Sequence, residues 1–514
     1  MPTQTDYYPT RGKAGRPFPV DIGRLCIQNR GEENIMDAKE RMAIPRHKAV
    51  ELAPAARITN YDEVTAGFDL TTAQSEAERC LQCKKPSCRE GCPLHNDIPG
   101  FIRLLREGKI EAAYWQDRET NTLPSVCSRV CPHEFQCEGS CIRGKKGEPV
   151  AIGMLERFLT DWMVTNGKNL ETACALPNNK KVAIVGSGPA GMTVAYLLAH
   201  LGYSCTIFES LPRLGGMLSV GIPAYRLPRA IVGAEFDSLR NCGVQIVQGV
   251  TIGHDKSLEQ LQAEGFGAVF VGIGAHASRK LGVEGEDLAG VIHGVDYLRQ
   301  VNLGARLNLG RNVVVVGGGN VAIDCARTAL REGSDQVFIL YRRSKAEMPA
   351  SKAEINHLEE EGVKIEMLAA PVKIHGANGR LTKIECIRMT LGECDASGRC
   401  RPVPQEGSNF MIAADAIVPA ISQDVDATVG QGQACAMSRR GTFVVDEETM
   451  QSNIPWVFAG GDAVLGPQTA AKAIYQARLA AESMHRFLSG QDLKANRTDI
   501  WRGLPVGKKE ASSV

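Results

Sequence analysis

The sequence predicts an α/β fold in which a helical N-terminal region precedes two Rossmann-like dinucleotide-binding domains, the second inserted in the first. Three observations lead to this prediction. Eight of the chain's 17 cysteines lie between positions 80 and 141, among short helical patterns. A buried-type strand, a glycine turn and a helix occur together twice, near Gly186 and near Gly317. A late strand ends in Gly460-Gly461-Asp462, which returns the chain to the first of these folds.

The bulk composition narrows the class of protein. A length of 514 residues suggests about three domains. The formal net charge is +1, which gives no general electrostatic case for binding nucleic acid. No apolar run approaches the ~20 residues that a membrane span requires, and residues 1–20 contain no secretory apolar run. We therefore expect a cytoplasmic protein without a membrane span.

Changes in composition and periodicity divide the chain into five expected segments. They are an extended N-terminal arm (1–45), a helical cysteine-rich domain (46–175), a first dinucleotide fold (180–285 and 420–490), a second fold (286–419) and a C-terminal tail (491–514). In the helical domain, apolar spacing predicts helices that begin at Thr71 or Thr72, cover 98–105 and run from 150 to 163. Residues 166–179 resemble a linker.

The cysteines fall into two groups of four. The first group is Cys80, Cys83, Cys88 and Cys92, and the second is Cys127, Cys131, Cys137 and Cys141. Thiolates at such short spacings can converge on metal centres, and the first group partly matches the ferredoxin pattern, in which the last cysteine serves the neighbouring iron–sulfur cluster. Two alternatives are weaker. Zinc sites favour paired Cys-x-x-Cys knuckles, of which there is one, and a disulfide framework requires an oxidising compartment.

The stretch 181–191 contains the elements of a dinucleotide site. Gly186 permits a tight turn, Gly188 lets a pyrophosphate approach the backbone, and Gly191 lets the following helix pack on the strand. The helix N-terminus then favours an anion through its free N–H groups and its dipole. The next strand ends in Glu209, whose carboxylate suits ribose hydroxyls and repels a 2′-phosphate.

The same pattern recurs over 312–322, with Gly317 and Gly319 in the turn. Here the second strand ends in Arg342 and Arg343 rather than in an acid. Guanidinium groups at this place can hold a 2′-phosphate through forked, charge-assisted hydrogen bonds. We expect the first fold to bind an adenine dinucleotide with a free ribose and the second to bind NADP.

The C-terminal part is expected to complete the first fold. Residues 416–423 return as a strand, and 456–459 form another strand before the Gly-Gly-Asp sequence. Asp462 is placed to accept a hydrogen bond from a ribityl hydroxyl, and the helix that begins near Thr469 offers its N-terminus to a flavin.

With these motifs in hand, the chain resembles the small (beta) subunit of NADPH-dependent glutamate synthase over about residues 40–490. Related modules occur in dihydropyrimidine dehydrogenase and in ferredoxin–NADP transhydrogenases. The resemblance rests on the following stretches: Cys80–Cys92, Thr122–Pro132, Cys137–Cys141, Gly186–Gly191, Gly221–Arg226, Gly317–Ala322, Tyr341–Arg343 and Ala459–Asp462.

The resemblance implies FAD in the first fold, NADPH in the second and two 4Fe–4S clusters in the helical domain. The implied FAD-binding residues are Gly186, Gly188, Pro189, Ala190, Gly191, Glu209, Gly216, Arg226, Gly461, Asp462 and Thr469. The implied NADPH-binding residues are Gly317, Gly319, Asn320, Val321, Ala322, Arg342 and Arg343.

Carried onto this sequence, the resemblance also assigns cluster ligands. One cluster takes Cys80, Cys83, Cys88 and Cys141, and the other takes Cys92, Cys131, Cys137 and a non-cysteine ligand, here Glu156. Spacing alone favours Cys127 for that fourth position. We adopt Glu156 and regard Cys127 as a nearby buried thiol.

The implied function is an electron-input subunit that oxidises NADPH, reduces FAD and passes single electrons through the clusters to a partner, with no catalytic side chain because cofactors supply the chemistry. A large glutamate synthase subunit is the first expectation for the partner. A transhydrogenase or another electron-transfer complex is the alternative. A disulfide reductase is less favoured, because Cys205, Cys242 and Cys325 stand alone and are interpreted as apolar fillers. A zinc-containing scaffold that retains the folds without turnover is a further, less favoured alternative.

Overall fold

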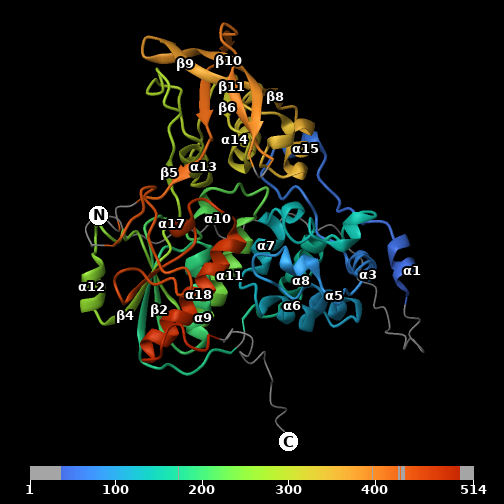
Figure 1. Cartoon of the computed structure of the whole chain (residues 1–514), viewed down its shortest axis with the longest axis vertical. Helices are drawn as coiled ribbons and strands as arrows, with labels where there is room; N and C mark the ends of the chain where they lie inside the picture. The colour runs from blue at the N-terminus through green and yellow to red at the C-terminus, as the bar shows by residue number, and fades with distance from the viewer. Residues whose placement is uncertain (1–35, 172, 396–397, 427–428, 430–434, 498–514) are drawn as a thin grey trace, which may run out of the picture.

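The computed structural model describes residues 36–171, 173–395, 398–426, 429 and 435–497. Three bodies are visible in Figure 1: a helical body at the lower right, an α/β body at the lower left and a second α/β body above, crowned by an antiparallel sheet. The predicted fold class, a helical domain followed by two dinucleotide folds with the second inserted in the first, is confirmed.

The helical body is built from short helices joined by the cysteine-bearing loops. Its buried core centres on Phe101, Ile102, Leu105, Tyr114 and Leu155. Its elements are α1 (Ala38–Ala43), α2 (Pro54–Arg57), α3 (Leu70–Glu78), α4 (Ser87–Glu90), α5 (Ile98–Arg106), α6 (Ile110–Arg118), α7 (Pro124–Val130), η1 (His133–Phe135), η2 (Ile142–Lys145) and α8 (Ile152–Thr165).

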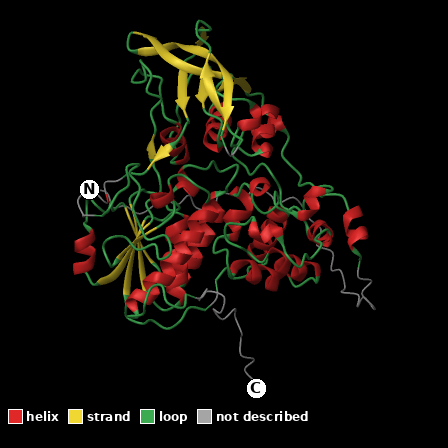
Figure 2. Ribbon diagram, in the orientation of Figure 1, coloured by secondary structure: helices red, strands yellow, loops and turns green. Residues whose placement is uncertain are grey.

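The lower-left body contains a parallel five-stranded sheet in the order β15-β4-β1-β2-β3, seen edge-on in Figure 2. Its strands are β1 (Lys181–Val185), β2 (Ser204–Glu209), β3 (Gln245–Gln248), β4 (Phe266–Val271) and β15 (Val457–Ala459). Its helices are α9 (Pro189–His200), α10 (Met217–Val220), α11 (Arg229–Asn241), α12 (Leu258–Ala263), α17 (Asp462–Leu465) and α18 (Ala470–Leu488). Because β15 pairs with β4 across nearly 190 residues, the C-terminal part completes this sheet, as predicted.

The upper body lies between β4 and β15 in the sequence. Its parallel sheet has the order β13-β6-β7-β8, with β6 (Asn312–Val316), β7 (Gln336–Tyr341), β8 (Lys364–Met367) and β13 (Ala416–Pro419). Its helices are α13 (Gly294–Asn302), α14 (Asn320–Arg331), η3 (Lys345–Glu347) and α15 (Lys352–Glu360). The ribbon that connects the two bodies pairs β5 (Ala277–Ser278) with β14 (Gln423–Asp424).

The antiparallel sheet above these strands was not predicted as a separate layer. It consists of β9 (Ala369–Ala377), β10 (Arg380–Cys394), β11 (Cys400–Pro404) and β12 (Phe410–Ala413), and it stands at the top of Figure 2. Buried side chains on its inner face, including Ile374, Leu381 and Ile384, pack against Val314 and Val316 of β6. The layer thus covers one face of the upper parallel sheet.

Buried ion pairs connect the three bodies. Arg118 of α6 pairs with Glu235 of α11 at 3.1 Å, and both side chains are about 2% exposed. Arg226, before α11, pairs with Asp324 of α14 at 2.8 Å. Removing one partner of such a buried pair leaves an uncompensated charge, which costs roughly 3–5 kcal/mol. These contacts fix how the bodies face one another.

Two expectations require correction. The N-terminal arm is not extended where it is described, because Asp37 and Glu40 form a reciprocal cap that starts helix α1; residues 1–35 and 498–514 lie outside the described residues. Cys242 is not a solitary apolar filler, because it forms a disulfide with Cys174. A second disulfide joins Cys394 to Cys400 at the tip of the β10–β11 hairpin. Both pairs lie away from the eight N-terminal cysteines, which are all free thiols.

Candidate functional site

One cavity of about 1360 Å³ runs between the two α/β bodies. Typical pockets for a single small ligand have roughly 300–1,000 Å³, so this volume suits more than one. Sixteen of the eighteen predicted dinucleotide-binding residues line it. They are Gly186, Gly188, Pro189, Ala190, Glu209, Gly216, Arg226, Gly317, Gly319, Asn320, Val321, Arg342, Arg343, Gly461, Asp462 and Thr469. Gly191 and Ala322 lie behind the wall, where they pack.

The turn after β1 requires its glycines for different reasons. Gly186 has a φ of +100°, in the left-handed region that favours glycine. At Gly191, a Cβ atom would lie 2.0 Å from the carbonyl oxygen of Gly186, so any side chain would push α9 off the strand. At Gly188, a Cβ atom would meet nothing within 4 Å. The backbone there is open to the cavity and to a phosphate group at the N-terminus of α9.

Glu209 has a structural task that the sequence did not reveal. Its carboxylate accepts hydrogen bonds from the backbone N–H of Ser187 at 3.0 Å and of Leu211 at 2.8 Å, and from the Ser187 hydroxyl. The side chain is only 4% exposed. It therefore organises the glycine turn itself while it lines the cavity.

At the second turn, three arginines lie close to one another. Arg342, Arg343 and Arg399 all line the cavity. Partial burial, together with the neighbouring Arg343 and Arg399 charges, lowers the pKa of Arg342. Arg343 uses its Nε to donate to the Cys400 carbonyl at 2.8 Å, which holds it in place. Like charges gathered at a cavity wall favour an anion, and a phosphate monoester fits this requirement.

Arg399 and His276 are site residues that sequence reasoning missed. Arg399 arrives from the turn between β10 and β11, a tertiary contact that no local motif signals. His276 lines the cavity next to the β5–β14 ribbon. Burial, and then the Arg299 charge, lower the pKa of His276 to about 4, so its imidazole is neutral at physiological pH.

Arg226 lines the cavity, but its guanidinium is engaged by acids of the upper body. It pairs with Asp324 at 2.8 Å and with Glu354 at 3.4 Å. It therefore connects the two dinucleotide folds at the cavity, in addition to any contact with a cofactor.

Asp462 begins α17, two glycines after β15, and lines the cavity. It accepts a hydrogen bond from the backbone N–H of Gln468 at 3.1 Å. Burial raises its pKa to about 7. Thr469 is the N-cap of α18, a helix of 19 residues, and its hydroxyl accepts from the N–H of Lys472. A helix N-terminus and a buried carboxyl thus meet at the lower end of the cavity.

We expect the flavin-free protein to lose stability as the pH rises from about 5 to 8, and the Asp462→Asn variant to lose less. A buried carboxyl whose folded pKa lies near 7 is protonated below that pH, and ionising it in the folded state is unfavourable. The contribution of this carboxyl to the free energy of unfolding is thus fully present below its unfolded pKa of about 4. It is lost as the pH rises through the folded pKa of about 7. Urea unfolding at several pH values measures this. Parallel pH profiles for both proteins would contradict the expectation.

The first set of thiols unites Cys80, Cys83, Cys88 and Cys141. Burial, followed by the proximity of Cys141 and Cys83, raises the pKa of Cys80 to about 11. Burial and the neighbours Cys80, Cys141 and Cys83 raise that of Cys88 to about 12. The fold therefore brings Cys141 across some 50 residues to the other three, which is the grouping that the resemblance implied.

The second set unites Cys92, Cys131, Cys137 and Glu156. Burial raises the pKa of Cys137 well above its usual value, and Cys92, Glu156 and Cys131 contribute to the shift. Burial, then Asp117, Cys131 and Cys92, raise that of Glu156. Glu156 lies on α8 and is 7% exposed. Its Oε1 accepts a hydrogen bond from Asn121 Nδ2 at 2.7 Å, which orients the carboxylate.

Cys127 lies in the same place. It is 3% exposed on α7, and a hydrogen bond with Cys131, followed by burial, raises its pKa well above the usual value. The structure thus places both candidates for the fourth ligand beside Cys131. A buried thiol or carboxyl gives up its proton only where a cation compensates the charge, and a cluster core would supply that compensation for either set.

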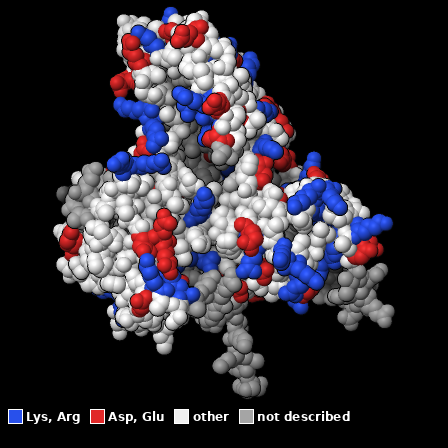
Figure 3. Space-filling model, in the orientation of Figure 1, with Lys and Arg blue, Asp and Glu red and all other residues white. Residues whose placement is uncertain are grey.

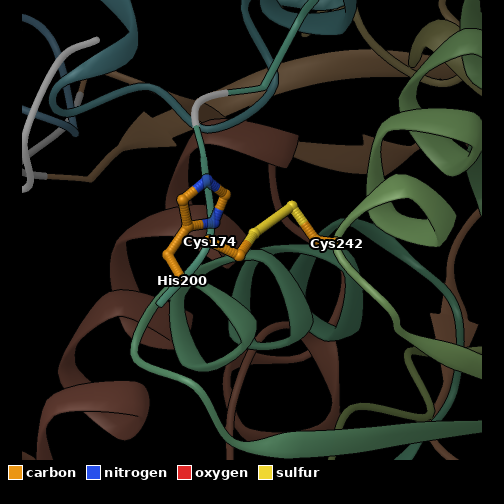
Figure 4. A group of neighbouring side chains, drawn as sticks. All are labelled: Cys174, His200 and Cys242. Atoms are coloured by element: carbon orange, nitrogen blue, oxygen red, sulfur yellow. A yellow bond between two sulfur atoms is a disulfide. The ribbon is translucent and has the colours of Figure 1, made fainter. Parts of the chain in front are cut away.

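The spacing of these groups does not suit a single metal ion. A zinc ion with Zn–S of about 2.3 Å holds its sulfur ligands roughly 4 Å apart. Among the described residues, the one group of three or more potential ligand atoms within 4.8 Å of one another is Cys174, His200 and Cys242. Figure 4 shows the His200 imidazole beside the bond that joins the two sulfurs. Neither sulfur in that bond is a thiolate, so the group does not offer a thiolate site in this state.

The second set lies at the wall of the cavity. Val130 and Pro132, the residues on both sides of Cys131, line the cavity, as does Phe135. Gln136 and Thr469 approach each other to 3.5 Å across the same boundary. The cysteine-rich body therefore contacts the lower end of the cavity, near Asp462. In the part of the chain that the structure describes, no helix has the length and apolarity needed to cross a membrane.

Comparisons with known proteins agree with this arrangement. The family model for the 4Fe-4S cluster domain II of dihydropyrimidine dehydrogenase matches residues 57–168. The model for pyridine nucleotide-disulphide oxidoreductases matches residues 180–477, more than half of the chain.

Individual relatives cover most of the chain. The NADP(+)-dependent formate dehydrogenase subunit beta of Moorella thermoacetica is 40% identical over 94% of this chain and 69% of its own. The glutamate synthase [NADPH] small chain of Azospirillum brasilense is 35% identical over 84% of this chain and 93% of its own. The solved structure of Mycobacterium tuberculosis FprA in complex with NADPH is similar over 60% of this chain and 85% of its own, with a TM-score of 0.53 and 19% identity, which concerns the fold alone.

Two dinucleotide folds around one cavity, next to a cysteine-rich 4Fe-4S domain, define an NADPH-dependent iron–sulfur oxidoreductase. The chain belongs to the pyridine nucleotide-disulphide oxidoreductase family and, within it, to the FAD-, NADPH- and iron–sulfur-containing oxidoreductases that include glutamate synthase small subunits.

Proposed function

We propose that this protein is an electron-transfer subunit that oxidises NADPH at its upper dinucleotide fold and exports single electrons through two 4Fe–4S clusters to a partner protein. FAD is assigned to the lower fold. One cluster is assigned to Cys80, Cys83, Cys88 and Cys141, and the other to Cys92, Cys131, Cys137 and Glu156. The observation that carries the proposal is that residues flanking Cys131 line the cavity shared by both dinucleotide folds.

The side chains of this chain bind and orient. The open backbone at Gly188 and the N-terminus of α9 suit a pyrophosphate. The cluster of Arg342, Arg343 and Arg399 suits a 2′-phosphate, which NADPH carries and NADH lacks. Asp462 suits a hydroxyl donor at the lower end of the cavity. When bound, the flavin would convert a two-electron hydride into single electrons, so we assign no catalytic side chain.

The helical body then has the task of conduction. Its second set of ligands adjoins the cavity. The first set lies next to the second, because Cys88 of the first set and Cys92 of the second are only four residues apart in the stretch 83–92. Cys92 packs against both the core of the helical body and that of the lower α/β body. This arrangement supports a path from the cavity through the second set to the first.

For the partner, a large glutamate synthase subunit is the first candidate, in keeping with the relative from Azospirillum. A different redox subunit is a second candidate, and one observation favours it: the relative named as a formate dehydrogenase beta subunit is more similar and spans more of this chain. Isolation of the protein from its host with its bound companion, identified by mass spectrometry, would decide between them.

Anaerobic reduction tests the core of the proposal. We expect the purified protein to contain flavin, iron and acid-labile sulfide, and its brown colour to bleach on addition of NADPH. A protein that contains flavin but neither iron nor sulfide would overturn the proposal. So would a colourless protein that contains zinc in place of iron.

A further inference from the structure

A second cavity, of about 950 Å³, opens beside the first set of cysteines. One wall is the loop that carries two of these cysteines, since Lys84 and Lys85 follow Cys83 directly and Arg89 follows Cys88. The opposite wall is the middle of α18, with Tyr475, and the end of the described chain at Arg497. We call this feature the basic groove.

The charges of the basic groove are unbalanced. Its lining contains five Lys and Arg side chains, Lys84, Lys85, Arg89, Arg478 and Arg497, against two acids, Glu90 and Glu482. Glu482 already pairs with Arg486 at 3.0 Å and with Arg497 at 3.5 Å. Among the described residues, no ion pair involves Lys84, Lys85 or Arg89. The loop beside the cysteines thus presents three cations that form no ion pair with the described part of the chain.

The groove also has an apolar contact point. Tyr475 is 41% exposed on α18, a large side chain that the fold does not cover. Aromatic side chains and arginine are enriched at protein interfaces, where a buried core is surrounded by a polar rim. Figure 3 shows further Lys and Arg side chains on the surface of the helical body, so the positively charged surface extends beyond the groove.

We propose that the basic groove is the docking surface for the acidic face of an electron-transfer protein or subunit, which receives electrons from the cluster assigned to Cys80, Cys83, Cys88 and Cys141. This inference rests on the proposed function and identifies the surface through which electrons leave the protein. The cavity between the dinucleotide folds adjoins the second set of ligands, and the loop that carries Cys83 and Cys88 of the first set forms one wall of the groove. Electrons would therefore enter beside the second set and leave beside the first.

Unpaired lysines at a groove act chiefly on the rate of association. A complementary charge on the partner steers its approach, which raises association rates by roughly ten- to a thousandfold at low ionic strength. The effect declines as salt shortens the screening length to about 10 Å at 0.1 M. An acidic occupant thus predicts a rate that falls with salt, whereas a basic or neutral partner does not.

The test compares charge reversal at the groove with an equal reversal elsewhere. The groove variant is Lys84→Glu/Lys85→Glu, and the control is Arg380→Glu/Lys383→Glu, two exposed cations on β10 at the far end of the molecule. The probe acceptor is an acidic ferredoxin, and a neutral quinone serves as the second acceptor. We expect the groove variant to reduce ferredoxin at least about tenfold more slowly at low salt, to approach the wild-type rate at high salt and to reduce quinone normally.

Three other results would overturn the proposal. An unchanged salt dependence in the groove variant, or an equal loss in the control variant, would mean that the groove does not bind the acceptor. If deletion of residues 498–514 alone abolished the salt dependence, the C-terminal segment rather than the groove would bind the acceptor. If the double reversal lowers the iron content, Lys84→Gln/Lys85→Gln replaces it. Failure of NADPH to bleach the wild-type protein would instead contradict the proposed function, so the two failures are distinguishable.

Discussion

Glu156→Ala is expected to reduce the iron content from about eight to about four atoms per chain. The alanine side chain has no atom that can bind a cluster iron. It also cannot accept the hydrogen bond from Asn121 that the carboxylate accepts at 2.7 Å. Iron and sulfide analysis, together with low-temperature EPR of the reduced protein, measures the outcome.

Cys127→Ser is the matched control for this prediction. Cys127 is buried on α7 in hydrogen-bond contact with Cys131, so it lies as close to the second set as Glu156 does. We expect this variant to retain its iron and both EPR signals. The reverse outcome, loss of iron in Cys127→Ser and full retention in Glu156→Ala, would transfer the fourth ligand position to the thiol.

Arg342→Ala is expected to raise the KM for NADPH about ten- to a hundredfold and to leave that for NADH unchanged. Hydrogen bonds to charged groups contribute roughly 1.5–3 kcal/mol each, and only NADPH carries the phosphate that the arginine cluster would hold. Arg399→Ala should act in the same direction, since Arg399 lines the same part of the cavity. Steady-state assays with an artificial acceptor measure both constants.

Arg311→Ala is the control for the arginine cluster. Arg311 precedes the other end of β6, is 82% exposed and pairs with Asp335. Its removal should change neither KM. If Arg342→Ala and Arg399→Ala left the preference between the two nucleotides unchanged, the assignment of NADPH to the upper fold would fall.

The parts of the fold that follow from local rules were predictable. A glycine turn after a buried strand fixes the helix that follows, and α9 begins at Pro189 and ends at His200 as the sequence indicates. The missed antiparallel sheet also had a local signal, the turn at Asn378-Gly379 between β9 and β10. Helix α1 also had a local sequence signal, because Asp37 and Glu40 have the spacing of a reciprocal cap.

Other features depend on contacts that no local pattern reveals. Cys174 and Cys242 are 68 residues apart, one in the linker and one after α11, so their pairing arises only when the linker lies along the lower body. Arg399 reaches the cavity because the start of β11 lies beside the end of β7, where Arg343 donates a hydrogen bond to the Cys400 carbonyl. Spacing alone favours Cys127 over Glu156, and it could not reveal that α7 and α8 carry both side chains beside Cys131.

The late return of the chain to the lower sheet affects how the protein is assembled on the ribosome. Strand β15 and helix α18, which supply Asp462 and Thr469 to the cavity, emerge after the entire upper body has been synthesised. The cysteine-rich body is complete about 300 residues earlier, and domains generally fold as units from the N-terminus during translation. The cysteine-rich body can therefore fold before the residues that would hold a flavin have been synthesised.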